Sequence, residues 1–332
     1  MPVNGRRAPA GMLRRKGAGA RAVALAEVLR QRETKDGATK VNRHAPGLAP
    51  DRNETLHLTR NPIWLSLAAI ALIGAACAHG GMPAGREIVW EGSVTVRGDV
   101  TIVPGETLVI RPGTRVSFAF RDDDGDGVGD ARIVVRGAVR AVGTAAAPIE
   151  FAPEREGAAP GWAEILVEDA ARAAFAWCRF AGAQQAVHAH RTPLTVEDCR
   201  LEHNGIGLRF TGGPVAIRRN RFEGNGTAVR YWESSPEIAA NEFAGNGTAV
   251  FVREGSARSV LSGNDFSSST DYHVKLGELQ AADVEARGNW WGTGRCEEIE
   301  RLIYDRQDAD YLGRVRYDPP AAGPLRGAAP GP

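Results

Sequence analysis

A triplet made of a small polar residue, any residue and a large apolar residue recurs along the second half of the chain. Its six copies begin at Cys178, Cys199, Asn220, Asn241, Asn264 and Asn289. Successive copies start 21, 21, 21, 23 and 25 residues apart. Self-similarity at a fixed period near 20 residues is typical of solenoid folds, so the pattern predicts stacked coils rather than one globular core.

Each repeat also alternates apolar and polar positions in the manner of short strands. Two inward columns result, one of Val187, Leu208, Val229 and Val250, the other of Ala189, Phe210, Tyr231 and Val252. The Asn-Gly pairs at 204–205, 225–226 and 246–247 favour the positive φ of tight corners. Three strands and three corners in about 21 residues predict one coil of a parallel β-helix, in which each strand pairs with its equivalent one coil away.

The polar column of the triplet is expected to point inward. We interpret its asparagines as a ladder of side-chain amides that satisfies backbone groups at the corners. Cys178 and Cys199 occupy the same column in adjacent coils, where equivalent Cα atoms lie about 4.8 Å apart. They either form a disulfide, for which this separation is suitable, or act as small apolar thiols.

These residues resemble the right-handed parallel β-helix repeat family, the pectate-lyase-like superfamily in the broad sense. The stretch VTVRGDVTIVPGETL at 94–108 resembles the first coils of bacterial surface β-helix proteins, and GNWWGT at 288–293 resembles their last. The resemblance covers about 85–320. It implies an all-β solenoid of about nine or ten coils with a short helical cap. It says little about function, because this scaffold carries lyases, hydrolases, epimerases and adhesins.

The composition of the chain before the solenoid predicts an export signal. Residues 1–56 are rich in Arg, Ala, Gly and Pro and are predicted to be a disordered basic segment. An apolar run of 14 residues at 63–76 ends at Cys77, which predicts a signal peptide over 57–77. The small residues before Cys77 resemble a bacterial lipobox and imply lipidation of that thiol, although Gly74 stands where the family usually has Leu. Simple secretion and an uncleaved anchor are the alternatives.

The expected domain boundaries follow from these segments. A tether over 78–87 leads to the β-helix at 88–293, a cap at 294–318 and a disordered tail at 319–332. Some 60 residues ahead of a signal peptide is unusual, so we hypothesise that translation begins nearer Val41 or Leu56. Ala78 and His79 lack an aspartate retention signal. This implies an outer-membrane lipoprotein, with a periplasmic or cell-surface location as the alternative.

The charge is unevenly distributed along the chain. Residues 1–76 contain 13 Lys+Arg and 5 Asp+Glu, so residues 77–332 hold 28 of the 41 basic and 35 of the 40 acidic side chains. A mildly acidic body argues against nucleic acid as a partner, and we expect a monomer.

An acidic loop at 122–130 interrupts a strand pair. Its ligand order is that of a calcium-binding loop, in which Asp122, Asp124, Asp126, the Val128 carbonyl and Asp130 would contribute oxygens. Ile133 stands where such loops carry a bidentate carboxylate. The sequence predicts a structural Ca²⁺ here, and a solvated acidic turn is the alternative.

The outward positions of one strand column predict a basic and aromatic face. Its members are His188, His190, Arg209, Arg230, Trp232, Arg253 and, if one residue is inserted in its coil, Lys275. Such a face suits acidic glycans, through charge-assisted contacts to carboxylates and stacking on the indole. The alternative is an ordinary solvated charged face, since exposed strand positions commonly carry such residues.

The same face is expected to lack paired carboxylates, which a glycosidase would need, and the acidic loop is predicted to lie several coils earlier. We therefore expect a secreted or lipid-anchored, non-catalytic binding or structural module, with acidic glycans as candidate ligands. The competing interpretation is a polysaccharide lyase or epimerase acting on uronic-acid polymers. A third is an adhesin that binds a protein partner.

Overall fold

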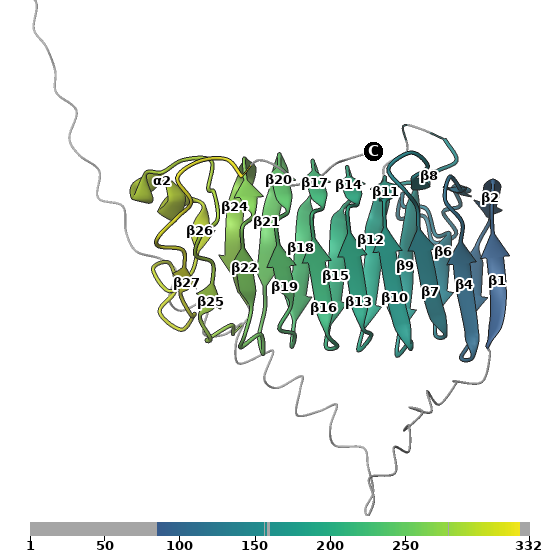
Figure 1. The fold of residues 1–332 in the computed structure, drawn as a ribbon, viewed down its shortest axis with the longest axis horizontal. Helices are drawn as coiled ribbons and strands as arrows, with labels where there is room; N and C mark the ends of the chain where they lie inside the picture. The colour runs from purple at the N-terminus through teal and green to yellow at the C-terminus, as the bar shows by residue number, and fades with distance from the viewer. Residues whose placement is uncertain (1–84, 156, 158–159, 278, 326–332) are drawn as a thin grey trace, which may run out of the picture. The chain divides into compact units, whose positions relative to one another are not determined.

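The computed structural model describes residues 85–155, 157, 160–277 and 279–325 (Figure 1). The predicted basic segment, the signal peptide with Cys77 and most of the tether lie outside the described residues. Within the described ranges, no helix has the length and apolar character needed to cross a bilayer. What the structure does describe is a stack of short strands with one helix near its C-terminal end.

The strands form three parallel sheets. Sheet 1 contains, in order, β1 (Arg86–Trp90), β4 (Glu106–Ile110), β7 (Ala138–Val142), β10 (Arg172–Ala176), β13 (Leu194–Glu197), β16 (Val215–Arg218), β19 (Glu237–Ala239), β22 (Val260–Ser262), β25 (Val284–Glu285) and β27 (Val315–Arg316). Sheet 2 contains β2 (Ser93–Val96), β5 (Arg115–Phe118), β8 (Ile149–Pro153), β11 (Cys178–Ala181), β14 (Arg200–Glu202), β17 (Arg221–Glu223), β20 (Glu242–Ala244) and β23 (Asp265–Phe266). Sheet 3 contains β3 (Asp99–Ile102), β6 (Arg132–Val135), β9 (Trp162–Glu168), β12 (Ala183–His190), β15 (Ile206–Thr211), β18 (Thr227–Trp232), β21 (Asn246–Val252), β24 (Ser269–Leu276) and β26 (Ile303–Tyr304).

Each of the first eight coils, from β1–β3 to β22–β24, supplies one strand to each sheet and then passes to the next level (Figure 1). The predicted inward column is confirmed, since Val187 pairs with Leu208 and Leu208 with Val229, always in parallel. Sheet 1 has ten strands, in agreement with the nine or ten coils that the repeat length predicts. The fold is therefore a parallel β-helix whose core runs along the stacking axis.

Aromatic rings fill that core in stacks one coil apart. Phe222, Phe243 and Phe266 follow one another with ring centroids 5.0 Å apart, and Trp291 continues the stack at 4.8 Å. All four side chains are at most 1% exposed. Stacked pairs of this kind add about 0.5–1.5 kcal/mol beyond the burial of their area.

Asparagines form the predicted ladder beside these rings. The Asn241 Oδ1 accepts from the backbone N–H of Asn220 at 2.9 Å and from its Nδ2 at 3.0 Å, and Asn241 Nδ2 donates to the Ile217 carbonyl. The same arrangement continues to Asn264 and Asn289. A second ladder joins Asn204, Asn225 and Asn246. Cys178 and Cys199 extend the first ladder as buried free thiols, so the disulfide alternative is not what the structure shows.

The corners lie one residue earlier than predicted. Positive φ occurs at His203 (53°), Gly224 (63°) and Gly245 (62°), immediately before the asparagines of the second ladder. The expectation that the Asn-Gly pairs themselves adopt positive φ was wrong. The asparagine turns inward to hydrogen-bond to the neighbouring coils, so the preceding residue makes the corner.

A short cap covers the last coil. Helix α2 (Cys296–Arg301) buries Ile299, and Leu312 is also fully buried. The sequence predicts a short helix over 296–304, but the helix ends at Arg301, because Ile303 and Tyr304 pair with Val274 and Lys275 as β26 of sheet 3. Further along, the Pro319 carbonyl accepts from the Gly288 N–H at 2.9 Å. The cap thus satisfies edge groups that would otherwise be open to pairing with other chains.

Replacing a ladder asparagine tests this fold. In Asn241→Ala, the Asn220 amide groups and the Ile217 carbonyl lose their partners while staying buried. We expect the free energy of unfolding, measured by chemical denaturation, to fall by about 2–5 kcal/mol. Arg258→Ala, at an exposed position of the same stack, is the control and should change it by less than about 0.5 kcal/mol. Equal stability of the two variants would contradict the ladder's role.

Candidate functional site

The outer face of sheet 3 brings the predicted site residues together. His188 pairs with Arg209, Arg209 with Arg230, Arg230 with Phe251 and Phe251 with Lys275, so these side chains form one column. In the adjacent column, His190 pairs with Thr211 and Thr211 with Trp232. The predicted one-residue insertion is present too, because the register of β24 shifts between the partners of Asn246 and Thr248.

Cations and aromatic rings lie against one another along this face. The guanidinium carbon of Arg209 is 5.2 Å from the Trp232 ring centroid, and that of Arg253 is 5.3 Å from the same ring. Arg230 lies 5.3 Å from the Phe251 ring. These are cation–π distances, and we call this set the cation–aromatic stripe. It comprises Arg209, Arg230, Trp232, Phe251, Arg253, Tyr272, Lys275 and Tyr304.

The charges of the stripe are only partly hydrated. Burial lowers the pKa of Arg209, and the neighbouring positive charge of Arg230 lowers it further. Burial also lowers the pKa of Arg253, where Glu254 acts in the opposite direction. Both side chains keep their charge, since arginine does not deprotonate in proteins. Arg209 donates to the neutral Gln185 side-chain oxygen at 3.0 Å. The stripe therefore concentrates positive charge with limited solvent screening.

A histidine–glutamate pair lies at one end of the stripe. His188 Nδ1 is 2.8 Å from Glu164 Oε2, and the histidine is 9% exposed. The His190 ring packs 4.4 Å from that of His188. Burial lowers the pKa of His190, as do the positive charges of His188 and Arg209, so this imidazole is mostly neutral at pH 7.

Two carboxylates that the sequence did not assign to this face lie beside its histidine end. Glu164 and Glu168 both lie on β9, and Glu168 pairs in register with His190. The register of β12 shifts between Gln185 and Val187, which displaces this column relative to the regular repeat. The sequence does not align these glutamates with the later repeats for that reason.

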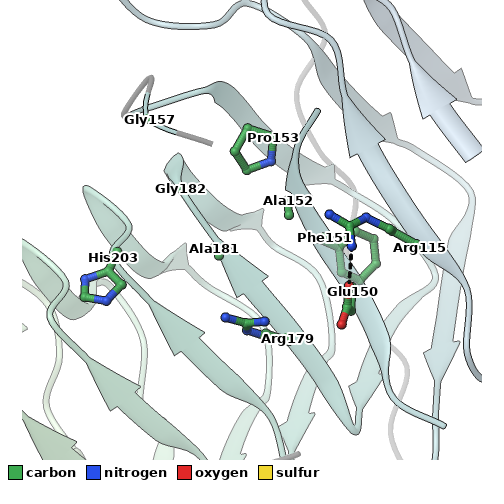
Figure 2. Close-up of a pocket in the computed structure, with 10 residues that line it drawn as sticks. All are labelled: Arg115, Glu150, Phe151, Ala152, Pro153, Gly157, Arg179, Ala181, Gly182 and His203. Carbon is green, nitrogen blue, oxygen red and sulfur yellow. Dashed lines mark hydrogen bonds and ion pairs between the residues drawn. The ribbon is translucent and has the colours of Figure 1, made fainter. Parts of the chain in front are cut away.

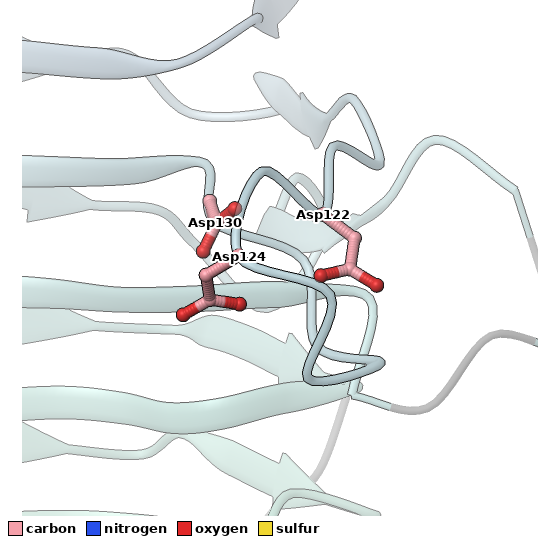
Figure 3. Close-up of side chains that lie close together, drawn as sticks. All are labelled: Asp122, Asp124 and Asp130. Atoms are coloured by element: carbon pink, nitrogen blue, oxygen red, sulfur yellow. The ribbon is translucent and has the colours of Figure 1, made fainter.

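The acidic loop between β5 and β6 brings three of its five predicted ligands together. Carboxylate oxygens of Asp122, Asp124 and Asp130 lie within 4.8 Å of one another (Figure 3). The Asp126 carboxylate instead accepts from the Val128 backbone N–H at 2.8 Å. Asp122 accepts from two glycine N–H groups of the loop. Three carboxylate oxygens at this spacing suit Ca²⁺, which prefers oxygen ligands, and calcium binding stays a prediction.

The loop lies several coils before Arg209, as the sequence predicts, but it reaches Glu164 on β9. A pocket of about 460 Å³ is lined by Asp99, Asp124 and Asp130 and also by Glu164, the partner of His188. The loop folds over the third coil, so residues distant in sequence share one cavity. An acidic pocket thus adjoins the histidine end of the stripe.

A second pocket of about 340 Å³ lies on the side of sheet 2 (Figure 2). It is lined by Arg115, Arg179 and His203 together with apolar side chains such as Pro153. Its arginines have carboxylate partners, Glu150 at 3.3 Å for Arg115 and Glu202 for Arg179. We interpret this pocket as a gap between surface charges that are already paired. The spacing of residues in the sequence did not predict it.

Comparison with known families bears on the fold. Residues 163–291 match the model described as the right handed beta helix region. The described chain is a right-handed parallel β-helix. Searches of curated proteins and of solved structures gave no match. Since the β-helix serves many activities, function has to be argued from the stripe and its surroundings.

Calcium binding to the acidic loop is testable by thermal unfolding. A Ca²⁺ ion that binds the folded β-helix should raise its melting temperature by about 5 °C at 100 times the Kd, and EGTA should reverse the shift. Asp124→Asn should abolish the response. The matched control is Asp123→Asn, since Asp123 pairs with Arg121 outside the ligand cluster. A wild-type melting temperature indifferent to both Ca²⁺ and EGTA would favour the solvated turn.

Proposed function

We propose that this β-helix is a non-catalytic module that binds acidic polysaccharides along the cation–aromatic stripe. The observation that carries the proposal is the succession of cations beside aromatic rings on in-register strands, with Arg209 and Arg253 both at the Trp232 ring. Uronate carboxylates are the anions that such guanidinium groups recognise through charge-assisted hydrogen bonds.

The spacing of the stripe supports a polymer rather than a small ligand. Strands in a parallel sheet lie about 4.8 Å apart, so Arg209, Arg230 and Lys275 present charges repeatedly along the stacking axis. A polymer lying along that axis would meet several of them. Extended surfaces of this kind are the usual binding faces of solenoid proteins.

The aromatic rings support binding by holding the cations in place. Lys275 Nζ lies 5.3 Å from the Phe251 ring, 5.6 Å from that of Tyr272 and 5.8 Å from that of Tyr304. A side chain already restrained loses less conformational entropy when a ligand arrives. Trp232 is itself in contact with two guanidinium groups, so we assign it this positioning role in addition to any stacking on sugar rings.

Export and anchoring complete the proposal. The signal peptide and Cys77 would place the β-helix in the cell envelope, as an outer-membrane lipoprotein or in the periplasm or at the cell surface. A lipid on Cys77 would hold the module at a membrane, where acidic polysaccharides are available as ligands. The Ca²⁺ predicted for the acidic loop would then be structural, ordering a loop beside the stripe.

The second candidate is a lyase or epimerase acting on uronic-acid polymers. One observation favours it, the largely buried Glu164–His188 pair that adjoins the stripe at one end. A carboxylate that orients an imidazole is a common arrangement for general bases. Incubation with polygalacturonate and alginate separates the two functions. Products with ultraviolet absorbance, new reducing ends or an altered uronate composition would support the enzyme, and an unchanged polymer would support the binding module.

Binding itself is tested with polygalacturonate at low salt. Arg230→Ala removes a cation and Trp232→Ala removes the ring at which two others lie, so we expect each to weaken binding about 10-fold or more. Affinity should also fall as salt is added. Isothermal titration calorimetry measures both effects.

The matched control is Arg200→Ala, on β14 of sheet 2, where the guanidinium pairs with Glu202 and Glu223. Its affinity for the polymer should equal that of the wild type. The proposal fails if the wild-type protein does not bind any acidic polymer at low salt, or if the control loses as much affinity as the stripe variants.

A further inference from the structure

Two buried nitrogens at the histidine end of the stripe have no hydrogen-bond partner within the described part of the chain. They are Nε2 of His188 and Nε of Arg209, and each has almost no exposed surface. The two residues face each other directly on β12 and β15. A buried polar atom without a partner costs about 1–3 kcal/mol, so a ligand that hydrogen-bonds to both nitrogens would recover this free energy on binding.

The Glu164 carboxylate decides which nitrogen of His188 carries a proton. At 2.8 Å from Nδ1 it can only accept, so the Nδ1 proton is fixed between the two groups. Nε2 is then an acceptor in the neutral ring and becomes a donor only in the imidazolium form. The Arg209 Nε–H is a donor at every relevant pH.

We propose that doubly protonated His188 and Arg209 form a subsite for one carboxylate of the bound polymer, so that binding takes up a proton. The proposal rests on the proposed polysaccharide binding and locates one end of it. In the neutral state, the Nε2 lone pair and a carboxylate would repel each other. In the imidazolium state, His188 Nε2–H and Arg209 Nε–H would offer two charged donors from register-paired residues of adjacent coils, one for each oxygen of a carboxylate.

The charged groups around His188 favour this proton uptake when an anion is present. Glu164 and Glu168 approach from β9, His190 from the same strand and Arg209 from β15. Arg209 and His190 oppose a further positive charge at His188, and an incoming carboxylate would offset both. The lowered pKa of His190, which burial and these neighbouring charges cause, shows how the crowding of positive charge acts here.

Access to the subsite requires a side-chain movement. Neighbouring side chains cover both nitrogens, and the His190 ring packs 4.4 Å from the His188 ring at the half-buried edge of the face. Rotation of the His190 side chain about its own bonds is a rapid motion and leaves the strands unchanged.

The sign of the pH dependence follows from linkage. Because the complex holds a proton on His188 that the neutral imidazole of the free protein lacks, binding takes up that proton and affinity falls as pH rises. One proton accounts for at most about tenfold in affinity per pH unit. The polymer must keep its own charge over this range, and a sulfated polymer does so at every pH used.

The experiment measures the affinity of the full chain for polygalacturonate and for dextran sulfate between pH 5.0 and 8.0. For the wild type we expect about 5–10-fold tighter binding of both polymers at pH 5.5 than at pH 7.5. His188→Gln keeps a polar group without a titrating one and should lose most of this ratio. Glu164→Gln removes the charge that favours the imidazolium and should move the pH midpoint downward. His203→Gln, at an exposed histidine in the corner between β14 and β15, should behave as the wild type.

The outcomes separate the subsite from the polysaccharide binding. If the wild type binds but His188→Gln keeps the same pH ratio, the subsite is refuted while the binding function stands. If His190→Gln alone abolishes the ratio and His188→Gln does not, the proton resides on the wrong imidazole and the proposal also fails. Absence of wild-type binding at any pH would refute both. Far-ultraviolet circular dichroism confirms that each variant is folded, and Glu164→Gln provides the test if His188→Gln is not.

Discussion

In-register parallel pairing between consecutive coils is the constraint on which the whole structure depends. Because Leu208 pairs with Val187 on one side and with Val229 on the other, each residue meets its own equivalent from the coils above and below. Inward columns become aromatic stacks and asparagine ladders, and outward columns become continuous stripes. A slip of one residue would turn every inward side chain outward, so both the core and the cation–aromatic stripe require this register.

The same pairing has opposite consequences inside and outside the helix. Inside, repeating Asn220 as Asn241 lets one amide satisfy the backbone and side chain of the next. Outside, repeating Arg209 as Arg230 places like-charged residues opposite each other on strands about 4.8 Å apart, which is unfavourable. The Trp232 and Phe251 rings offset part of that repulsion. A bound anion would reduce the repulsion that remains between these arginines. This links the repeat to the proposed function.

Sequence reasoning predicted the regular coils well and the irregular ones poorly. The spacing of Cys178, Cys199 and the asparagines fixes the register of β11 to β24, and with it the alignment of Arg209, Arg230 and Lys275. The position of Glu164 beside His188 was not predicted, because β9 lies before the regular repeat and β12 contains a register shift. The approach of the acidic loop to Glu164 depends on the path of a loop in space, which no period encodes. The corners were misplaced by one residue because asparagine in Asn-Gly was assigned to the turn rather than to the ladder.

The most direct test of this account is to duplicate one complete coil, residues 213–233, within the chain. If stacking in register generates both the core and the stripe, the longer protein should unfold cooperatively with stability at least equal to the wild type, and it should bind polygalacturonate more tightly because Arg230 and Trp232 occur twice. A duplicated protein that unfolds without cooperativity, or that folds but binds no better than the wild type, would contradict the account.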